Sequence, residues 1–179
     1  RVSRVYLTEA GREIRGNASV QEVVLSDDTR LPADVVVAGV GVTPVVDYLE
    51  GTGLVQDGAV PVDATLRTGA EGVYAAGDIA AVPDPHTGQR RRVEHWIVAE
   101  RQGQHAAGAM LGSQAPYEEV PFFWTSQCGK PLKYVGYAAR PDQIVVRGEI
   151  GKGEFMTGYY EGGQLRAIAA SGRARETIA

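Results

Sequence analysis

Asp78 is the residue of this chain best placed for ligand chemistry. The apolar run Val73-Tyr74-Ala75-Ala76 leads into Gly77-Asp78 and is followed by small residues. A glycine at the end of a strand has no Cβ, so a ligand can approach the backbone closely. Doubly wound folds bind ligands at the open ends of their parallel strands. A carboxylate that meets no cation there can accept hydrogen bonds from a sugar-like polyol. The alternative is that Asp78 only caps a helix after a core strand.

A second group of candidate residues, Glu94-His95-Trp96, begins sixteen residues after Asp78. It opens a pattern that predicts a helix from Glu94 to about Leu111, and a helix N-terminus stabilises nearby negative charge. A histidine can transfer protons, although one beside a tryptophan is often only packed and hydrogen-bonded. Trp96 and Trp124 could likewise be ordinary core aromatics. The three histidines and the single cysteine show no metal-ligand spacing.

The elements that must position these residues follow from the hydrophobic pattern. Residues 18–25 alternate, a turn follows, and 29–32 restart the chain, which predicts a β-hairpin. Residues 34–39 form a continuous apolar run, typical of a strand covered on both faces. Thr43 is predicted to cap a helix that has Pro44 at its first position and ends at Gly51. Residues 59–62 predict a further short strand.

The periodicity changes after the second helix. One stripe of that helix carries mostly small residues at three- and four-residue spacing: Trp96, Ala99, Gly103, Ala106 and Met110. Beyond residue 116 the sequence alternates between glycine turns. The segments 132–137, 143–148, 154–160 and 164–170 therefore predict an antiparallel sheet. Residues 2–7 are predicted to form a turn of helix or a strand.

Composition excludes few functions. The net charge of −4 gives no reason to expect nucleic acid or an anionic membrane as a partner. There is no run of eighteen apolar residues. Cys128, the single cysteine, excludes an internal disulfide and a redox-active cysteine pair within these 179 residues, and a cytoplasmic setting is the default expectation. The chain begins at Arg1 in what looks like the middle of a domain, so we expect it to be a fragment.

The order of these motifs resembles a known family. A strand runs into Gly39-Val40-Gly41, another runs into Gly77-Asp78, Glu94-His95-Trp96 opens a helix, and Phe122-Phe123-Trp124-Thr125-Ser126-Gln127 precedes an antiparallel domain. This is similar to the C-terminal half of the FAD-dependent NAD(P)H:ferredoxin or rubredoxin reductases, the putidaredoxin-reductase and apoptosis-inducing-factor-like group. The resemblance spans nearly the whole chain, and the segment around Trp124 is its most specific part.

The resemblance implies a role for each matching residue. Asp78, after Gly77, would bind the ribityl chain of FAD. Glu94, His95 and Trp96 would lie at the flavin ring, where the helix N-terminus can stabilise charge on the pyrimidine side. Trp96 would also lie near the nicotinamide, and Trp124 would cover the flavin from the C-terminal domain. Gly39 and Gly41 would lie near the bound NAD(P)H. No residue of the chain is expected to act as a general acid or base.

The resemblance also implies the domain organisation. We expect an α/β protein with a partial doubly wound FAD/NAD(P)-binding domain, followed by an α+β C-terminal reductase domain with an antiparallel sheet. Residues 1–36 would end the NAD(P)-binding domain, 37–115 would be the returning segment of the FAD-binding domain, and 116–179 would be the C-terminal reductase domain. The segment from Ser171 to Glu176 resembles the entry to the family's last helix.

The chain lacks a motif that is typical of the family. Neither Gly-x-Gly-x-x-Gly fingerprint occurs, although those turns hold the dinucleotide pyrophosphates. Most of the dinucleotide affinity should then be missing, and the chain alone should be inactive. We also expect apolar surface to be left uncovered, which predicts either a rearranged or swapped homodimer or a core built only around the C-terminal sheet.

The functional prediction is a flavoprotein oxidoreductase that passes electrons from NAD(P)H through FAD to a ferredoxin- or rubredoxin-type partner. The alternatives are a disulfide reductase or NADH oxidase of the same superfamily, or a non-catalytic interaction module. The run Arg90-Arg91-Arg92, with Lys130 and Lys133, could steer an acidic ferredoxin to the surface. The other interpretation of that run is a solvated loop.

Overall fold

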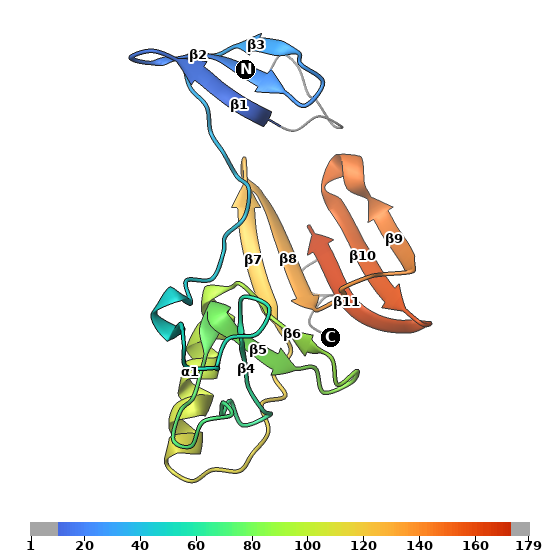
Figure 1. Cartoon of the computed structure of the whole chain (residues 1–179). Coiled ribbons are helices and arrows are strands. Elements are labelled where there is room, and N and C mark those ends of the chain that lie inside the picture. Colours follow the sequence, from blue (N-terminus) through green and yellow to red (C-terminus); the bar gives the residue numbers. More distant parts are fainter. Residues whose placement is uncertain (1–10, 173–179) are drawn as a thin grey trace. The chain divides into compact units, whose positions relative to one another are not determined.

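The computed structural model describes residues 11–172 of the 179-residue chain. The chain divides into two compact units, residues 1–43 and 44–179, which are treated separately below (Figure 1). The predictions for residues 2–7, and for a last helix beyond Gly172, lie outside the described residues. No helix among the described residues is long and apolar enough to cross a membrane.

The first unit contains a three-stranded antiparallel sheet in the order β1-β2-β3. Its strands are β1 (Gly11–Gly16), β2 (Val20–Leu25) and β3 (Arg30–Pro32). The predicted hairpin is confirmed as β2 and β3, whereas β1 was not predicted. The turn is closed by Asp27, whose carboxylate accepts hydrogen bonds from the backbone N–H and the hydroxyl of Thr29, both at 2.8 Å.

Two predictions between residues 34 and 51 are wrong. Residues 34–39 form no strand, and Val35 and Val37 are 79% and 91% exposed. An apolar run becomes a two-sided buried strand only where neighbouring strands pair with it, and none does so in the described part of the chain. The predicted helix at 43–51 is reduced to the 3-10 turn η1 (Asp47–Leu49), which has no side-chain cap.

The second unit begins with a small mixed sheet and one long helix. β4 (Val60–Pro61) pairs in parallel with β5 (Ala80–Pro83), and β5 pairs antiparallel with β6 (Arg90–Arg91). The helix α1 (Trp96–Met110) packs beside η2 (Gly77–Ile79). The short strand at 59–62 and the helix from about residue 94 are thus confirmed. The predicted strand at 73–76 is wrong, because Tyr74 forms only an isolated antiparallel bridge with Arg67.

The main core lies under this sheet and helix. Its buried members come from β4, β5, α1, the loops between them and the segment that follows α1: Val60, Val62, Leu66, Ala75, Ala80, Val82, Ala106 and Tyr117. The expectation of a core built only around the C-terminal sheet is therefore wrong. Leu66 is completely buried although its φ is +65°, in the left-handed region. A buried leucine in that conformation shows that packing overrides the local backbone preference here.

Helix α1 buries a different stripe from the one predicted. Val98, Gln102, Ala106 and Ala109 are its buried residues, and of the predicted stripe only Ala106 is among them. Trp96 and Met110, at the two ends, are 62% and 60% exposed. Gln102 explains the shift, because its buried amide oxygen accepts a hydrogen bond from the Gly77 N–H at 2.8 Å. A polar residue can face a core where its hydrogen bonds are made.

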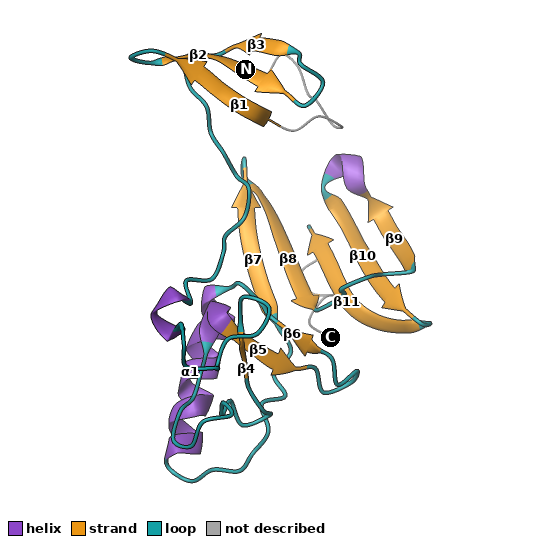
Figure 2. Cartoon of the chain, in the orientation of Figure 1, coloured by secondary structure: helices purple, strands orange, loops and turns teal. Residues whose placement is uncertain are grey.

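The C-terminal part is a five-stranded antiparallel sheet in the order β7-β8-β11-β10-β9 (Figure 2). Its strands are β7 (Phe122–Gln127), β8 (Lys130–Gly136), β9 (Gln143–Glu149), β10 (Glu154–Glu161) and β11 (Gln164–Ser171), with the 3-10 turn η3 (Ile150–Lys152) between β9 and β10. All neighbours pair antiparallel. The four predicted strands are confirmed, and β7 is an addition. The predicted fold class is likewise confirmed.

Candidate functional site

Gly77 allows the turn η2 to pack closely against helix α1. Its φ of +79° lies in the left-handed region that favours glycine. A Cβ built on Gly77 would lie 3.3 Å from the Cβ of Ala99 in the helix, so any larger residue would press against α1. Because the Gly77 N–H also donates to buried Gln102, the backbone on both sides of Gly77 is held in place.

Asp78 presents a free carboxylate beside the start of α1. Its backbone carbonyl accepts a hydrogen bond from Arg92 at 2.8 Å, and the same guanidinium pairs with Glu94 at 2.8 Å. Arg92 therefore ties the turn at Asp78 to the residues that open the helix. The Asp78 side chain is exposed and has no ion pair or hydrogen bond within the described residues. It is available to accept hydrogen bonds from a ligand.

His95 is the N-cap of α1. Its Nδ1 accepts a hydrogen bond from the Ile97 N–H at 3.3 Å. A side-chain acceptor at this position satisfies one of the N–H groups that a helix leaves unpaired in its first turn. This bond requires Nδ1 to carry a lone pair, so the ring proton is assigned to Nε2. His95 is thus packed and hydrogen-bonded, as one of its two interpretations expected, and the structure adds that its hydrogen bond caps α1.

The N-terminus of α1 meets strand β7 through aromatic side chains. The rings of Trp96 and Trp124 meet edge to face, with centroids 6.0 Å apart and an interplanar angle of 73°. The rings of His95 and Phe123 lie 5.4 Å apart. Trp96 and Trp124 are 62% and 51% exposed, so their interpretation as core aromatics is wrong. The start of α1 therefore presents two exposed tryptophan rings, and Arg92 ties the turn that carries the Asp78 carboxylate to the same helix start.

Gly39 and Gly41 lie in the first unit, and the structure does not place them relative to Asp78 and α1. A Cβ at either position would meet open space, and Gly41 has a φ of +82°. Their location near a nicotinamide stays a prediction.

Comparison with known proteins identifies the family. The sequence pattern described as "Pyridine nucleotide-disulphide oxidoreductase" matches residues 4–103, and the one described as "Reductase C-terminal" matches residues 122–179. The first match covers more than half of the 179 residues. The chain belongs to the pyridine nucleotide-disulphide oxidoreductase family.

Several named proteins of this kind are similar to the chain over most of its length. Human apoptosis-inducing factor 3 is 34% identical over 171 residues, which is 93% of this chain and 28% of that protein. The ferredoxin–NAD(+) reductase component of the anthranilate 1,2-dioxygenase system from Burkholderia cepacia is 37% identical over 160 residues, 89% of this chain and 39% of that protein. The chain thus spans well under half the length of these curated relatives.

Solved structures give the same result. The crystal structure of a ferredoxin reductase from Rhodopseudomonas palustris is similar with a TM-score of 0.87 and 34% identity, covering 95% of this chain and 42% of that one. The covalent putidaredoxin reductase–putidaredoxin complex gives a TM-score of 0.85 and 29% identity over the same shares. The expected resemblance to the C-terminal part of an oxidoreductase of this family is confirmed.

The arginine run at residues 90–92 is not a solvated loop, which was one of its two interpretations. Arg90 donates to the backbone carbonyls of Val62 and of Ala81, the latter at 3.0 Å. Arg91 forms an ion pair with Asp84 at 2.6 Å, and both side chains are only 13% and 12% exposed. With Arg92 bound to the Asp78 carbonyl, all three guanidinium groups are engaged within the chain. They do not form a free basic patch.

The pKa of Asp84 reflects this network. Burial alone would raise the pKa of its carboxyl group. Hydrogen bonds from the backbone N–H groups of His86 and Thr87, at 2.8 and 3.0 Å, and the charge of Arg91 outweigh that effect and lower the pKa. Asp84 therefore remains ionised in the folded protein and holds the β5–β6 hairpin together. Sequence reasoning missed Asp84 and Gln102, because their partners are fixed only by the fold.

Proposed function

We propose that the protein is an FAD-dependent oxidoreductase that passes electrons from NAD(P)H through FAD to a ferredoxin-type iron–sulfur partner. The observation that carries this proposal is the free Asp78 carboxylate beside the capped N-terminus of α1 and the exposed Trp96–Trp124 pair. The order of the motifs and the names of the similar ferredoxin reductases support it.

The residues of this surface fit FAD. The ribityl chain of FAD is a polyol, and the Asp78 carboxylate is free to accept hydrogen bonds from it. Gly77 has no side chain to block the approach of that chain to the backbone. The positive end of the α1 dipole suits the pyrimidine side of the ring, where negative charge gathers on reduction. A Cβ at residue 77 would press against Ala99 and disturb the packing of η2 on α1, so this close packing requires a glycine.

The protein's contribution to the chemistry is position and electrostatics. A bound flavin supplies hydride acceptance from NAD(P)H and one-electron transfer to the acceptor. Asp78 and Gly77 would hold the ribityl chain, while Glu94, His95 and Trp96 would lie at the ring. Trp124 would cover the ring from strand β7 and exclude water from it. Gly39 and Gly41 would allow the nicotinamide close to the backbone. No side chain is assigned as a proton donor or acceptor.

The identity of the electron acceptor is inferred from the similar proteins. Its support is that similar proteins are named as ferredoxin reductase components, and that one similar structure contains putidaredoxin. A cytoplasmic location and a homodimer are further parts of the proposal. A disulfide reductase is less well supported, because residues 122–179 match the pattern described as "Reductase C-terminal" and the similar proteins are named as ferredoxin reductases.

The direct test is electron transfer by the whole protein. We expect purified protein to be yellow, to oxidise NADH or NADPH, and to reduce a [2Fe–2S] ferredoxin in an anaerobic spectrophotometric assay. Trp124→Ala should slow that transfer, whereas Trp124→Phe should retain most of it. A colourless protein that neither binds FAD nor oxidises NAD(P)H would instead favour the non-catalytic interaction module.

A further inference from the structure

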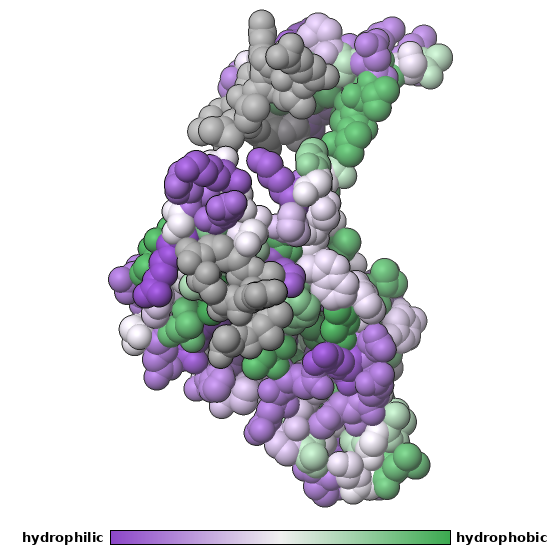
Figure 3. All heavy atoms as spheres, turned by 180° about the vertical axis from the view of Figure 1, so that it is seen from behind, coloured by the Kyte–Doolittle hydropathy of each residue, from purple (hydrophilic) through white to green (hydrophobic). Residues whose placement is uncertain are grey.

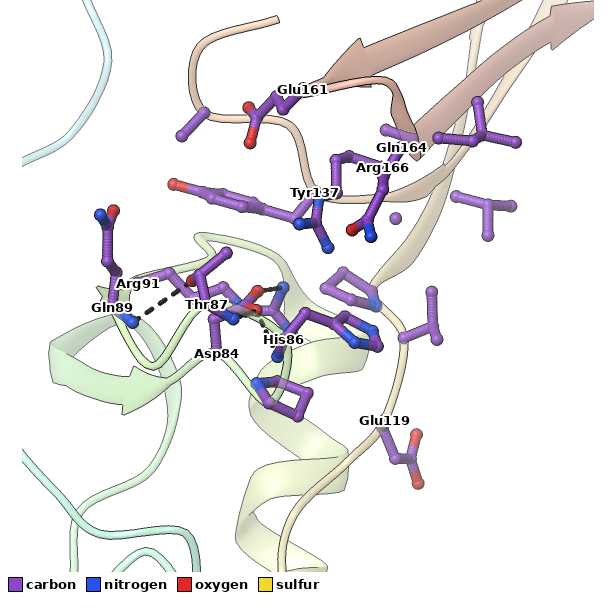
Figure 4. A pocket seen from close by; sticks show the side chains of 18 of the residues that line it. Asp84, His86, Thr87, Gln89, Arg91, Glu119, Tyr137, Glu161, Gln164 and Arg166 are labelled. Carbon is purple, nitrogen blue, oxygen red and sulfur yellow. Dashed lines mark hydrogen bonds and ion pairs between the residues drawn. The ribbon is translucent and has the colours of Figure 1, made fainter.

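A cavity lies on the second unit between the β5–β6 hairpin and the C-terminal sheet. Its volume is about 480 Å³, within the usual range for small-molecule sites. One wall is formed by the loop from Asp84 to Arg91, and the other by the ends of β8 and β11 (Figure 4). None of the residues proposed to hold FAD lines it. The cavity therefore needs an explanation of its own.

Arg166 reaches into this cavity from β11, on the side opposite His86 (Figure 4). Its Nε is fully buried and has no hydrogen-bond partner. Within the described residues, the Arg166 guanidinium also forms no ion pair. The residue as a whole is only partly buried. A buried N–H group without an acceptor is unfavourable, so a ligand that accepts a hydrogen bond from Nε would stabilise this arrangement.

The backbone holds Arg166 in this position. Its carbonyl accepts a hydrogen bond from the Tyr137 N–H at 3.1 Å. A Cβ on Gly136 would lie only 2.1 Å from the same carbonyl oxygen, and the φ of Gly136 is +93°. The close approach of β8 to β11 thus depends on a glycine. The position of Arg166 at the cavity wall is built into the sheet.

Most of the other charged side chains around the cavity have partners, whereas Glu118, which also lines it, is exposed and has no ion pair or hydrogen bond within the described residues. Asp84 is paired with Arg91, and Glu119 with Arg101. Glu161 accepts a hydrogen bond from the Arg140 N–H at 2.6 Å. Arg90 donates to two backbone carbonyls. Among the described arginines that line the cavity, Arg166 is therefore the one left without an acceptor.

The rest of the lining suits an apolar ligand body. Tyr137 presents its ring to the cavity, with the Arg91 Cζ 5.3 Å from the ring centroid (Figure 4). Aliphatic side chains complete the lining, among them Val120, Val135 and Ile168. Gln164 and His86 add polar groups to the lining. An arginine at one end of an apolar chamber matches a ligand with a carboxylate at one end of an apolar body.

We propose that this cavity binds a small organic carboxylate, with Arg166 as the cation that pairs with it. Tyr137 and the aliphatic wall hold the apolar body. The site is separate from the proposed flavin surface, and its occupancy is measured by binding, without any requirement for electron transfer.

The test is a binding titration of the whole protein with benzoate, monitored by isothermal titration calorimetry and ligand-observed NMR. We expect saturable binding with a Kd of about 1 mM or tighter. Benzamide has the same shape without the charge, and inorganic phosphate has the charge without the ring. Both should bind at least tenfold more weakly than benzoate.

Variants assign the binding to the cavity. Arg166→Gln should weaken benzoate binding at least tenfold. Arg147→Gln, which removes an exposed arginine on β9 outside the cavity, should leave it unchanged. Arg166→Lys should restore part of the affinity, because it keeps the charge but not the planar fork. Circular dichroism verifies that each variant is folded. The comparison of benzoate with benzamide needs no variant, so it tests the site even if Arg166→Gln fails to fold.

Three results would overturn the proposal. One is the absence of saturable benzoate binding. Another is binding of phosphate or benzamide as tightly as benzoate, which would show that charge or shape alone is recognised. The third is equal benzoate affinity in Arg166→Gln and the unaltered protein.

Discussion

At the residue scale, single backbone positions determine how the proposed flavin surface is built. Gly77 combines a left-handed φ with a close approach to α1. The free carboxylate of Asp78 depends on that turn, because the residue directly follows Gly77. A side chain at residue 77 should therefore affect both stability and the geometry of the site.

Gly77→Ala should destabilise the protein by about 1–2 kcal/mol, the usual penalty for a left-handed alanine. Contact with Ala99 adds to the penalty. Urea unfolding followed by circular dichroism measures the change. Gly103→Ala is the matched control, because Gly103 lies in α1 with open space around it. That variant should gain up to about 1 kcal/mol from helix propensity. Equal effects of the two substitutions would contradict the assigned role of Gly77.

At the element scale, the start of helix α1 positions both the turn at Asp78 and the Trp96–Trp124 pair. The helix starts at Trp96 because His95 caps it and Arg92 ties Glu94 to the turn at Asp78. The position of the Trp96 ring against Trp124 follows from that start.

The cap predicts a specific pattern of substitutions at residue 95. His95→Ala should lower the free energy of unfolding by about 0.5–2 kcal/mol, the range for loss of an N-cap. His95→Asn should retain most of the stability, because asparagine is a good N-cap residue. Thermal unfolding of the three proteins compares them. If His95→Asn is as unstable as His95→Ala, then the ring contact with Phe123, rather than the cap, is what matters.

The β5–β6 hairpin predicts a dependence of stability on pH. The folded pKa of Asp84 is lowered, so its contribution to stability is present above the ordinary carboxyl pKa of about 4 and is lost as the pH falls through the folded value. Asp84→Asn should destabilise the protein at neutral pH by about 3 kcal/mol, because it leaves Arg91 buried without its partner.

Unfolding titrations between neutral and acidic pH test this prediction. The stability of Asp84→Asn should change less with acid than that of the unaltered protein. Asp57→Asn is the control, since Asp57 is exposed and its left-handed φ of +50° suits asparagine. Parallel pH profiles for the unaltered protein and Asp84→Asn would show that this carboxylate does not contribute.

At the scale of the whole molecule, much apolar surface is exposed. On the face of the molecule shown in Figure 3, hydrophobic side chains gather in several places. Along the chain, five valines that follow β3 and precede η1 are 65–91% exposed: Val35, Val37, Val40, Val42 and Val45. Monomeric proteins rarely expose such groups together, so we expect another segment to cover them in the whole protein. The relatives are much longer than this chain.

Limited proteolysis tests whether the valine segment is covered. In the isolated 179-residue chain, thermolysin should cleave first within residues 34–45 and release a product that keeps the core of the second unit. In the whole protein the same bonds should be protected. Equal cleavage rates in the two proteins would show that nothing covers the valines.

The sequence predicted what depends on local pattern and missed what depends on distant partners. The β8–β11 strands and helix α1 were predictable, because alternation and helical periodicity are local. The segments 34–39 and 73–76 look like buried strands, but strands need neighbours, which the sequence does not specify. The stripe on α1 was misassigned because Gln102 is polar, although its bond to Gly77 allows it to face the core. Asp78 was proposed from its place after an apolar run and Gly77, and Trp96 and Trp124 from family resemblance, whereas Arg166 carried no sequence signal.

The most direct test of the account is FAD binding, measured by the change in flavin fluorescence when the whole, flavin-depleted protein is titrated with FAD. We predict saturable binding that Asp78→Asn weakens at least tenfold, about 1.4 kcal/mol, and that Trp124→Ala also weakens. Asp57→Asn changes an exposed aspartate outside the proposed flavin surface, and this variant should bind FAD as tightly as the unaltered protein does. Unchanged FAD affinity in both Asp78→Asn and Trp124→Ala would contradict the placement of the flavin at this surface.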